Sequence, residues 1–487
     1  MAPFLSRLAR DGCAGKAFVP ALNLLVAVLL SLTGTLARAA LPVLAPSPFA
    51  DGTQVDTAVL GYRIPVILVH GLGGSTEGWD RFLRAYEQSP GWRDAFKPYS
   101  FRFGSTTAEV IFDPAAPRTI SALGAALRDA MQGFYDRPEA APDFGFGNKR
   151  VIVLAHSMGG LVARSMMQEH VFSDGQRGGQ KVLHLITLGT PHHGTPLADA
   201  AIALGLHTVS ELDEGYFAFV ADTAWTNFDG LNMSGGRCNH WLAQLNNYAP
   251  ATGGNYGRCG AVPANPLPGY YWKIIAYGAS ALQNRDWYLG ETGVYKPGSS
   301  TSLLFPYNYL RGALPRSYPN DGIVPLVSAQ LEGASLWLRR QAYDCDHRYI
   351  RRGYPEFVRS PASTYTDWAF CAGTDSGQSY ASGISGGYAV SGSIMGVAGG
   401  IVDTIKTASE MERVLNWVEW KFPGYLAPAG ATSDIVGKHY YRYYSSTEAY
   451  LAVSSGNLYY LGAASGSPLV FLGTLGDLLP HAQAAGF

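Results

Sequence analysis

The stretch VIVLAHSMGGLVAR, from Val151 to Arg164, restricts the possible folds of this chain more than any other stretch. Its first half is an unbroken apolar run rich in β-branched residues, which is typical of a strand buried on both faces of a parallel sheet. Ser157 follows this run directly and has glycines behind it. The pattern predicts a sharp strand-to-helix turn that exposes the Ser157 hydroxyl at the carboxyl edge of the sheet, although a serine here is also a common helix N-cap.

Other apolar runs have the same character as the run before Ser157. They cover residues 64–74, 181–194, 270–280 and 334–343. Helical candidates lie between some of them, the clearest ending at Tyr135 and the next following Ser157. The alternation of strands and helices predicts an α/β fold, with a mostly parallel central sheet and helices on both faces.

Two regions depart from this alternation. Residues from about 197 to 269 are rich in Asn, Gly, Tyr and Trp and predict a long, lid-like insertion. After Phe422, short aromatic and β-branched runs separated by turn residues predict a small antiparallel β unit. We therefore expect a signal peptide at 1–39, an α/β domain at 40–421 and a small β domain at 422–487.

A helix is expected just before this β unit. Met411, Val414, Leu415 and Val418 have helical spacing, and Ser409 with Glu412 matches the capping-box pattern at a helix start.

The amino-terminal region has the pattern of a secretory signal. Basic residues precede an apolar stretch, and Ala37 and Ala39 match the small-x-small cleavage rule. The apolar stretch approaches the about 18 residues of a membrane-spanning helix, so an uncleaved anchor is the alternative. We expect cleavage after Ala39 and a secreted or periplasmic protein. The net charge of −1 gives no support for a nucleic-acid partner.

Five cysteines are present, and Cys13 would leave with the signal peptide. The four others form an even set, which in an exported chain suggests two disulfides. Of the three possible pairings, Cys238–Cys259 and Cys345–Cys371 each close a modest loop and are preferred.

A serine nucleophile needs a base and an acid that orients the base. His347, in YDCDHRY after the last apolar run, is the preferred base. His184 is expected in the core, and His192 and His193 near a pocket. The remaining downstream histidines are His170, His207, His240, His439 and His481.

Asp321, in NDGIVPLVSA, is the preferred acid because it lies between a strand and His347. Asp344 and Asp346 are alternatives that lie very close to His347 in sequence, and Asp286 is a more distant one. The developing oxyanion also needs donors, and the backbone N–H groups of Leu72 and Met158 are expected to supply them.

Several motifs together resemble the α/β-hydrolase superfamily, and within it the secreted bacterial lipases. They are VILVHGLGG, VLAHSMGGLVAR, LITLGTPHHGTPLAD, NDGIVPLVSA and the pair DH at 346–347, in the family's order over residues 61 to 350. The elbow has Ala155 in place of the first Gly of G-x-S-x-G, a variation that such lipases show. The resemblance implies an α/β-hydrolase fold with a Ser157–His347–Asp321 triad. The insertion and the C-terminal β unit depart from a minimal lipase.

The resulting hypothesis is an exported ester hydrolase that acts on acyl esters, with lipids such as triacylglycerol as the expected substrates and transient contact with a lipid interface. It needs no cofactor and no metal site is expected. The alternatives are a polyester depolymerase, an acyltransferase on the same triad, and a binding protein without catalysis. A complete triad in the right order argues against the last. The sequence leaves the oligomeric state open.

Overall fold

The structure of this chain is a computed structural model. The described residues are 42–72, 76–103, 119–138, 145–198, 240–246, 267–280, 307–308, 310, 320–331, 334–343, 346–347, 349–352, 372–375, 389–390, 393–394, 396–423, 431–436, 439–444 and 449–487.

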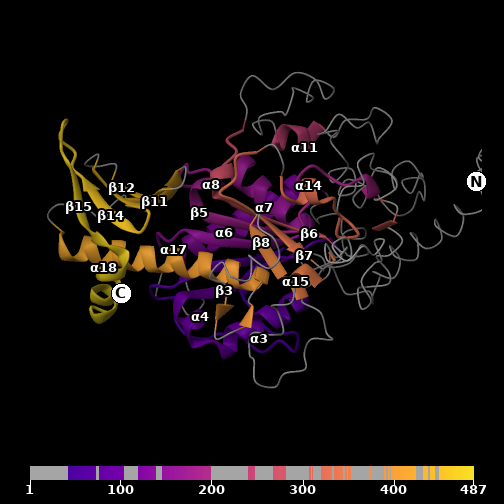
Figure 1. Ribbon diagram of the computed structural model, residues 1–487, viewed down its shortest axis with the longest axis horizontal. Helices are drawn as coiled ribbons and strands as arrows, with labels where there is room; N and C mark the ends of the chain where they lie inside the picture. Colours follow the sequence, from indigo (N-terminus) through magenta and orange to yellow (C-terminus); the bar gives the residue numbers. More distant parts are fainter. Residues whose placement is uncertain are drawn as a thin grey trace, which may run out of the picture.

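A twisted central sheet of eight strands has the order β1-β3-β2-β4-β5-β6-β7-β8 (Figure 1). The strands from β3 to β7 run parallel, and β1 and β8 join the two edges antiparallel. Their bounds are Val43–Pro46 (β1), Ile64–Val69 (β2), Phe96–Arg102 (β3), Val151–His156 (β4), Val182–Leu188 (β5), Ile274–Ser280 (β6), Leu338–Tyr343 (β7) and Ala372–Asp375 (β8). The predicted α/β fold is confirmed.

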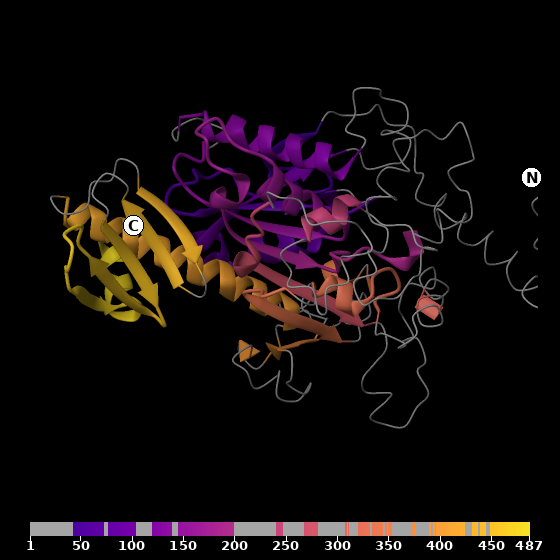
Figure 2. The ribbon, with the colours of Figure 1, turned by 90° about the horizontal axis from the view of Figure 1, so that it is seen from above.

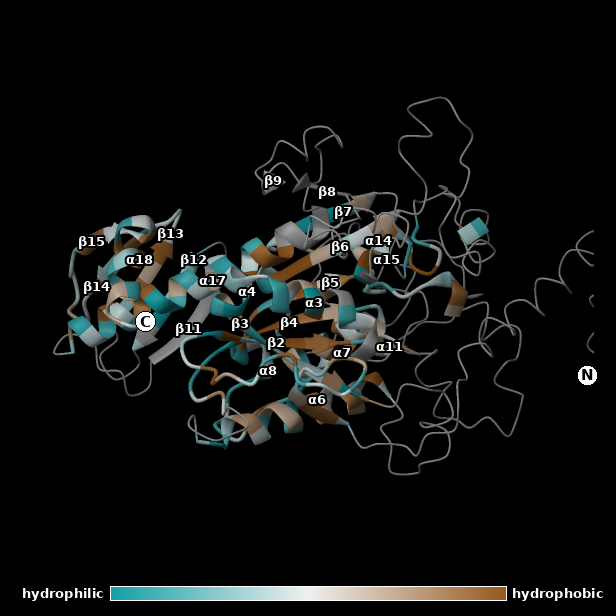
Figure 3. Ribbon diagram, turned by 90° about the horizontal axis from the view of Figure 1, so that it is seen from below, coloured by the Kyte–Doolittle hydropathy of each residue, from teal (hydrophilic) through white to brown (hydrophobic). Residues whose placement is uncertain are grey.

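Helices cover both faces of this sheet (Figure 2). On one face, α6 (Ile120–Tyr135) and α7 (Met158–Glu169) pack on Ile67 and Val153. On the other face, α3 (Asp80–Gln88), α4 (Pro90–Ala95) and α17 (Gly396–Lys421) pack on Val66 and Ile152. Neighbouring residues of β2 and β4 point to opposite faces of the sheet, and helices cover both faces, so apolar residues point to both sides. Figure 3 shows this hydrophobic centre of the molecule.

The C-terminal region forms a second sheet, as predicted. Its five antiparallel strands follow the chain order: β11 (Ala431–Val436), β12 (His439–Tyr444), β13 (Ala449–Ser454), β14 (Asn457–Leu461) and β15 (Leu469–Thr474). A helix that the sequence analysis did not anticipate, α18 (Leu475–Ala484), follows them, and the Thr474 hydroxyl caps it by accepting from the Asp477 N–H at 3.1 Å. This sheet lies at the end of the molecule away from α14 (Leu326–Ala329) and α15 (Tyr349–Arg352) (Figure 1).

One expectation about α17 is wrong. The helix begins at Gly396, so Ser409 lies inside it and is buried. Ile401, Val402 and Ile405 are buried in the hydrophobic core that α17 shares with the sheet. The burial of these residues stabilises helical turns that precede Ser409. Packing of an apolar face outweighs a single capping pattern, so the helix does not begin at Ser409.

The remaining described elements are short. They are the 3₁₀ turns η1 (Thr76–Trp79) and η4 (Tyr271–Lys273), the helices α8 (Gly178–Lys181) and α11 (His240–Leu245), and the paired strands β9 (Ala389–Val390) and β10 (Ser393–Ile394). Within the described ranges, no helix is both long enough and apolar enough to cross a membrane.

Candidate active site

Ser157 lies at the strand-to-helix turn that the sequence predicts. β4 ends at His156 and α7 begins at Met158, so Ser157 joins them, with φ 55° and ψ −134°. A positive φ is unusual for a residue with a side chain and marks a strained turn. Ser157 occupies the N-cap position of α7, but its hydroxyl makes no cap hydrogen bond. The strained backbone instead directs this hydroxyl at a histidine.

Two glycines let the neighbouring loop approach this turn. A Cβ on Gly71 would lie 2.5 Å from the Ser157 Cβ and 3.1 Å from its Oγ. A Cβ on Gly159 would lie 2.3 Å from the carbonyl oxygen of His70. The distances of 2.5 and 2.3 Å are shorter than a carbon contact allows. The loop after β2 can therefore cross the turn only because Gly71 and Gly159 have no side chains.

His347 and Asp321 complete a continuous chain of hydrogen bonds from Ser157. The Ser157 Oγ lies 2.8 Å from the Nε2 of His347, and the Nδ1 of His347 lies 2.8 Å from Asp321 Oδ2. Because an ionised carboxylate only accepts, Nδ1 carries the proton and the neutral ring presents Nε2 as the acceptor for the serine hydroxyl. The arrangement can therefore take the hydroxyl proton as the oxygen attacks an electrophile.

Asp321 is held by several backbone groups. Its Oδ1 accepts from the N–H groups of Ile323 and Val324 at 2.9 and 2.7 Å, and its carbonyl oxygen accepts from the N–H of His347 at 2.8 Å. The carboxylate is fully buried. These bonds leave Oδ2 aimed at the imidazole, which fixes the ring's orientation.

Gly189, directly after β5, leaves room for the Asp321 carboxylate and the His347 ring. The sequence analysis did not identify this glycine. Its φ is +58°, and a Cβ there would lie 2.9 Å from Asp321 Oδ2 and 3.1 Å from His347 Nδ1. The glycine in LITLGTP is the signal that could have been used, since it follows a buried strand at the same sheet edge as Ser157.

His156 is a second residue that the sequence analysis did not assign. Its Nε2 donates to the main-chain carbonyl of His347 at 2.7 Å, and the two rings lie 4.8 Å apart. The elbow strand is thereby tied to the loop that carries the imidazole. Its place directly before Ser157 in the elbow motif was the available signal.

The expected oxyanion donors belong to the turn and to the loop that crosses it. Met158 is the first residue of α7, and Leu72 follows Gly71 in the loop over the turn. His70 fixes this loop: its ring stacks on Phe103 at 4.0 Å, its Nδ1 donates to the Gly71 carbonyl at 2.9 Å, and its Nε2 accepts from the N–H of Phe103. Burial lowers the pKa of His70 to about 4, so the ring is neutral at pH 7.

Other buried histidines have different surroundings. His184 is buried in β5, and desolvation lowers its pKa to about 4, in agreement with the expected core position. His192 and His193 are fully buried; His192 contacts Arg164 and Thr187, and the N–H of His193 donates to Ser328 Oγ. Neither side chain is exposed to solvent.

A described part of the insertion, α11 with Asn246, is attached to α7. The carbonyl of Leu245, at the end of α11, accepts from Arg164 at 2.9 Å and from Gln168 at 3.4 Å. The Nδ2 of Asn246 donates to the carbonyl of His192 at 2.6 Å. These bonds hold α11 against α7.

Several expected residues lie outside the described part of the chain. They are the signal peptide at 1–39, most of the insertion, Asp286, Asp344, and the cysteines Cys238, Cys259, Cys345 and Cys371. Asp346 is described and fully buried, but Asp321 is the carboxylate bonded to His347. In the described ranges, no group of three or more His, Cys, Asp or Glu side chains could hold a metal ion.

Comparisons with known proteins match one part of the chain to a known family. Residues 61–214 match the family described as "PGAP1-like alpha/beta domain", a segment that includes Ser157. A search of curated proteins found no match. Among solved structures, the chain is similar to Bacillus licheniformis lipase BlEst2 in its mature form, at 18% identity and a TM-score of 0.36, with 60% of this chain and 89% of that chain covered.

Two further solved structures have comparable values. EstA from Clostridium botulinum is 14% identical, with a TM-score of 0.34 and coverage of 71% of this chain and 95% of that chain. Staphylococcus hyicus lipase is 15% identical, with a TM-score of 0.34 and coverage of 63% and 92%.

Proposed function

We propose that this chain, a member of the α/β-hydrolase superfamily, is a serine ester hydrolase that cleaves carboxylic acyl esters through Ser157, His347 and Asp321. The observation that carries the proposal is the unbroken hydrogen-bond chain from the Ser157 hydroxyl through both ring nitrogens of His347 to the buried carboxylate of Asp321. A strained backbone presents the serine at one end of that chain, which is the arrangement that activates a weak nucleophile.

The reaction proceeds in two halves. Ser157 Oγ bonds to the ester carbonyl carbon while its proton passes to His347 Nε2, and the carbonyl oxygen takes up negative charge that the N–H groups of Leu72 and Met158 stabilise. The intermediate then collapses, and the leaving alcohol takes the proton from Nε2. Water repeats the same steps on the acyl-enzyme and releases the acid. Asp321 keeps its negative charge throughout and holds the ring in the required tautomer.

Hydrolysis of a short p-nitrophenyl ester tests the triad. Ser157→Ala and His347→Ala should each lower kcat by at least about 10⁴-fold, and Asp321→Asn by about 10⁴-fold through loss of the productive tautomer. Ser455→Ala is the matched control, because Ser455 is another serine with positive φ (50°) in an exposed turn of the C-terminal sheet. Near-normal activity in Asp321→Asn together with loss in Asp346→Asn would show that the acid is wrongly assigned.

A substrate panel tests the finer proposal of a lipid ester. We propose lipid esters such as triacylglycerol as the substrates, because the sequence motifs quoted above resemble those of secreted bacterial lipases. The panel compares hydrolysis rates on p-nitrophenyl esters of increasing chain length, on triacylglycerol and on an aliphatic polyester. We expect higher rates on the lipid substrates than on the short esters and the polyester. A rate highest on polyester, or acyl transfer to an added alcohol that exceeds hydrolysis, would favour one of the alternatives.

We also propose that the chain is exported and cleaved after Ala39. The basic residues, the apolar stretch and the small residues at 37 and 39 support this. Amino-terminal sequencing of the protein recovered outside the cytoplasm should begin at Ala40. An intact amino terminus on a membrane-bound protein would instead indicate the uncleaved anchor.

A further inference from the structure

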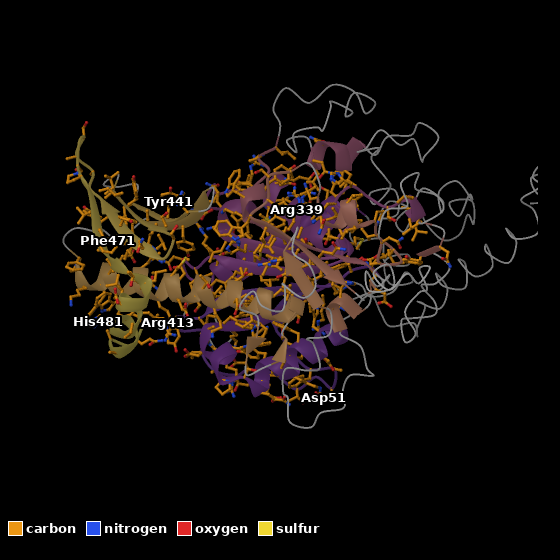
Figure 4. All side chains as sticks on the ribbon, viewed as in Figure 1. Asp51, Arg339, Arg413, Tyr441, Phe471 and His481 are labelled. Atoms are coloured by element: carbon orange, nitrogen blue, oxygen red, sulfur yellow. The ribbon has the colours of Figure 1, made fainter. Side chains whose placement is uncertain are left out.

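The last strand of the C-terminal sheet, β15, lies at its edge. Of the described strands, β14 alone pairs with it. In a strand with one covered face, buried and exposed residues alternate. On β15, Leu469, Val470 and Phe471 are consecutive and are 56%, 42% and 55% exposed. This part of the strand is therefore open on both faces as well as along its edge, and Phe471 lies at the outer end of the sheet in Figure 4.

Charged residues are missing from this part of the sequence. From Ala449 to Gly476, which includes β13, β14 and β15, there is no Asp, Glu, Lys or Arg. Soluble proteins usually protect a free edge with charged side chains, because an uncharged apolar edge invites another strand. Pro468 lies before the exposed residues and the β-bulge lies after them, because Leu472 of β15 is the extra residue between the pairs Tyr459–Phe471 and Leu458–Gly473. The edge of β15 is unprotected where it is most apolar.

Apolar surface continues from this edge across the outer face of the sheet. The strand register aligns Tyr441, Ala452, Tyr459 and Phe471 in one row across β12, β13, β14 and β15. The Tyr459 and Phe471 rings contact each other with centroids 5.6 Å apart. The opposite face is buried in the core, through residues such as Tyr444 and Leu451. A strand added beside β15 would therefore extend this apolar row.

We propose that β15 pairs antiparallel with β15 of a second copy of this chain, so that the two C-terminal sheets join across a twofold axis. A twofold contact brings a surface against its own copy, so a charged edge would place like charges together. The uncharged stretch from Ala449 to Gly476 avoids this repulsion. Pairing centred on Val470 sets Leu469 of one copy against Phe471 of the other and covers both copies of Val470.

The proposed contact leaves the candidate active site free. Strand β11 contacts β5 and η4, and η4 directly precedes the amino end of β6. Ser157 lies at the carboxyl end of β4, and α14 and α15, next to Asp321 and His347, lie at that same end (Figure 1). Pairing through β15 therefore joins the copies far from Ser157, and this inference does not depend on the proposed function.

Sedimentation of the purified full chain tests the contact, with Val470→Lys as the variant and Val59→Lys as its matched control. Val59 is an apolar residue, 69% exposed, in the loop before β2, so it receives the same change away from the sheet. The wild type and Val59→Lys should sediment as dimers at micromolar concentration. Val470→Lys should raise the dissociation constant about tenfold or more, because it loses apolar burial and places two lysines together. Its circular dichroism should match that of the wild type.

Cysteine cross-linking gives a second measurement if Val470→Lys does not fold. Oxidised Val470→Cys should yield a disulfide between residues 470 of two copies in peptide maps, whereas Val59→Cys should not. A monomeric wild type would overturn the proposal, as would a dimer that survives Val470→Lys in a folded protein. A different protein found bound along β15 would overturn it as well.

Discussion

Gly189 shows at the scale of one residue how the backbone makes room for the site. Its left-handed φ and its lack of a side chain together leave the space that the Asp321 carboxylate and the His347 ring share. We expect Gly189→Ala to lower kcat by at least about 10²-fold, because a small misplacement of a positioned base is costly.

Gly175→Ala controls for backbone strain in that experiment. Gly175 also has a positive φ (+79°), but a Cβ there would meet nothing within 4 Å. Both variants should lose stability, since an alanine with positive φ is strained. Only Gly189→Ala should lose activity in the folded protein; equal kcat values in the two variants would mean that the close approach is unimportant.

His184 predicts how stability changes with pH. Burial holds its folded pKa at about 4, while the unfolded residue titrates near 6.5. As the pH falls from 6.5 toward 4, the unfolded state takes up a proton that the folded state does not, so stability falls by up to about 3 kcal/mol. Above pH 6.5 the residue has no effect. Urea unfolding of His184→Phe should therefore show a shallower loss of stability over this range.

Two further histidines define the controls for His184. His70 has a similarly lowered pKa, so the pH dependence should shrink in His184→Phe without disappearing. His439→Phe, at an exposed position, should follow the wild type. A wild-type slope in His184→Phe would show that this histidine is not kept neutral.

At the scale of elements, a buried charge cluster joins the C-terminal sheet to α17. Arg442 of β12 donates to Glu419 Oε2 and to Asn416 Oδ1, each at 2.7 Å, and also pairs with Glu412. All of these residues except Arg442 come from α17. Arg442→Met would leave two carboxylates without their cation and should lower the free energy of unfolding by about 3–5 kcal/mol.

An exposed pair is the control for this prediction. Arg128 and Asp129 are 29% and 66% exposed, so Arg128→Met should change the free energy of unfolding by less than about 1 kcal/mol. Urea denaturation measures both variants. A cost at Arg442 no larger than at Arg128 would mean that the cluster does not hold the sheet.

The sequence predicts a strand or helix correctly when the burial of its own residues determines its pattern of apolar residues. β2, β4 and β5 are apolar on both faces, and a run of apolar residues therefore identifies them. β3 escaped prediction because it contains Lys97 and Pro98. Lys97 is nevertheless fully buried, since its Nζ donates to the carbonyls of Asp56 and Ala58 at 2.7 and 2.8 Å, contacts that no local pattern reveals.

The residues of the site also form two groups, those that the sequence identifies and those that only the folded structure reveals. Ser157, His347 and Asp321 were found because their chemistry and chain order are recognisable, and the structure brings them within hydrogen-bond distance. Gly189 and His156 act through backbone space and a main-chain carbonyl of a distant residue. Those properties exist only once the chain has folded.

For the whole molecule, one hydrophobic core extends from the central sheet through α17 to the C-terminal sheet. It includes Val66 of β2, Leu415 of α17 and Leu451 of β13. We therefore expect a single thermal unfolding transition in calorimetry. A chain ending at Lys421, the expected domain boundary, should melt at least about 5 °C lower than the full chain, because Trp417 loses the His481 ring that stacks on it.

Two separate transitions, or a truncated chain that melts at the full-length temperature, would contradict this expectation. The control is Trp417→Phe in the full chain, which keeps an aromatic ring against His481 and should shift the melting temperature less than truncation.

The length of α17 also limits how this gene can recombine. The helix runs unbroken from Gly396 to Lys421 and supplies Glu412 and Glu419 to Arg442 of the following sheet. A crossover at the apparent boundary after residue 421 would join the sheet to a foreign helix without these carboxylates. A crossover within the helix would separate the residues that pack on the central sheet from those that hold the arginine. We therefore expect the C-terminal sheet to be exchanged between proteins only together with α17.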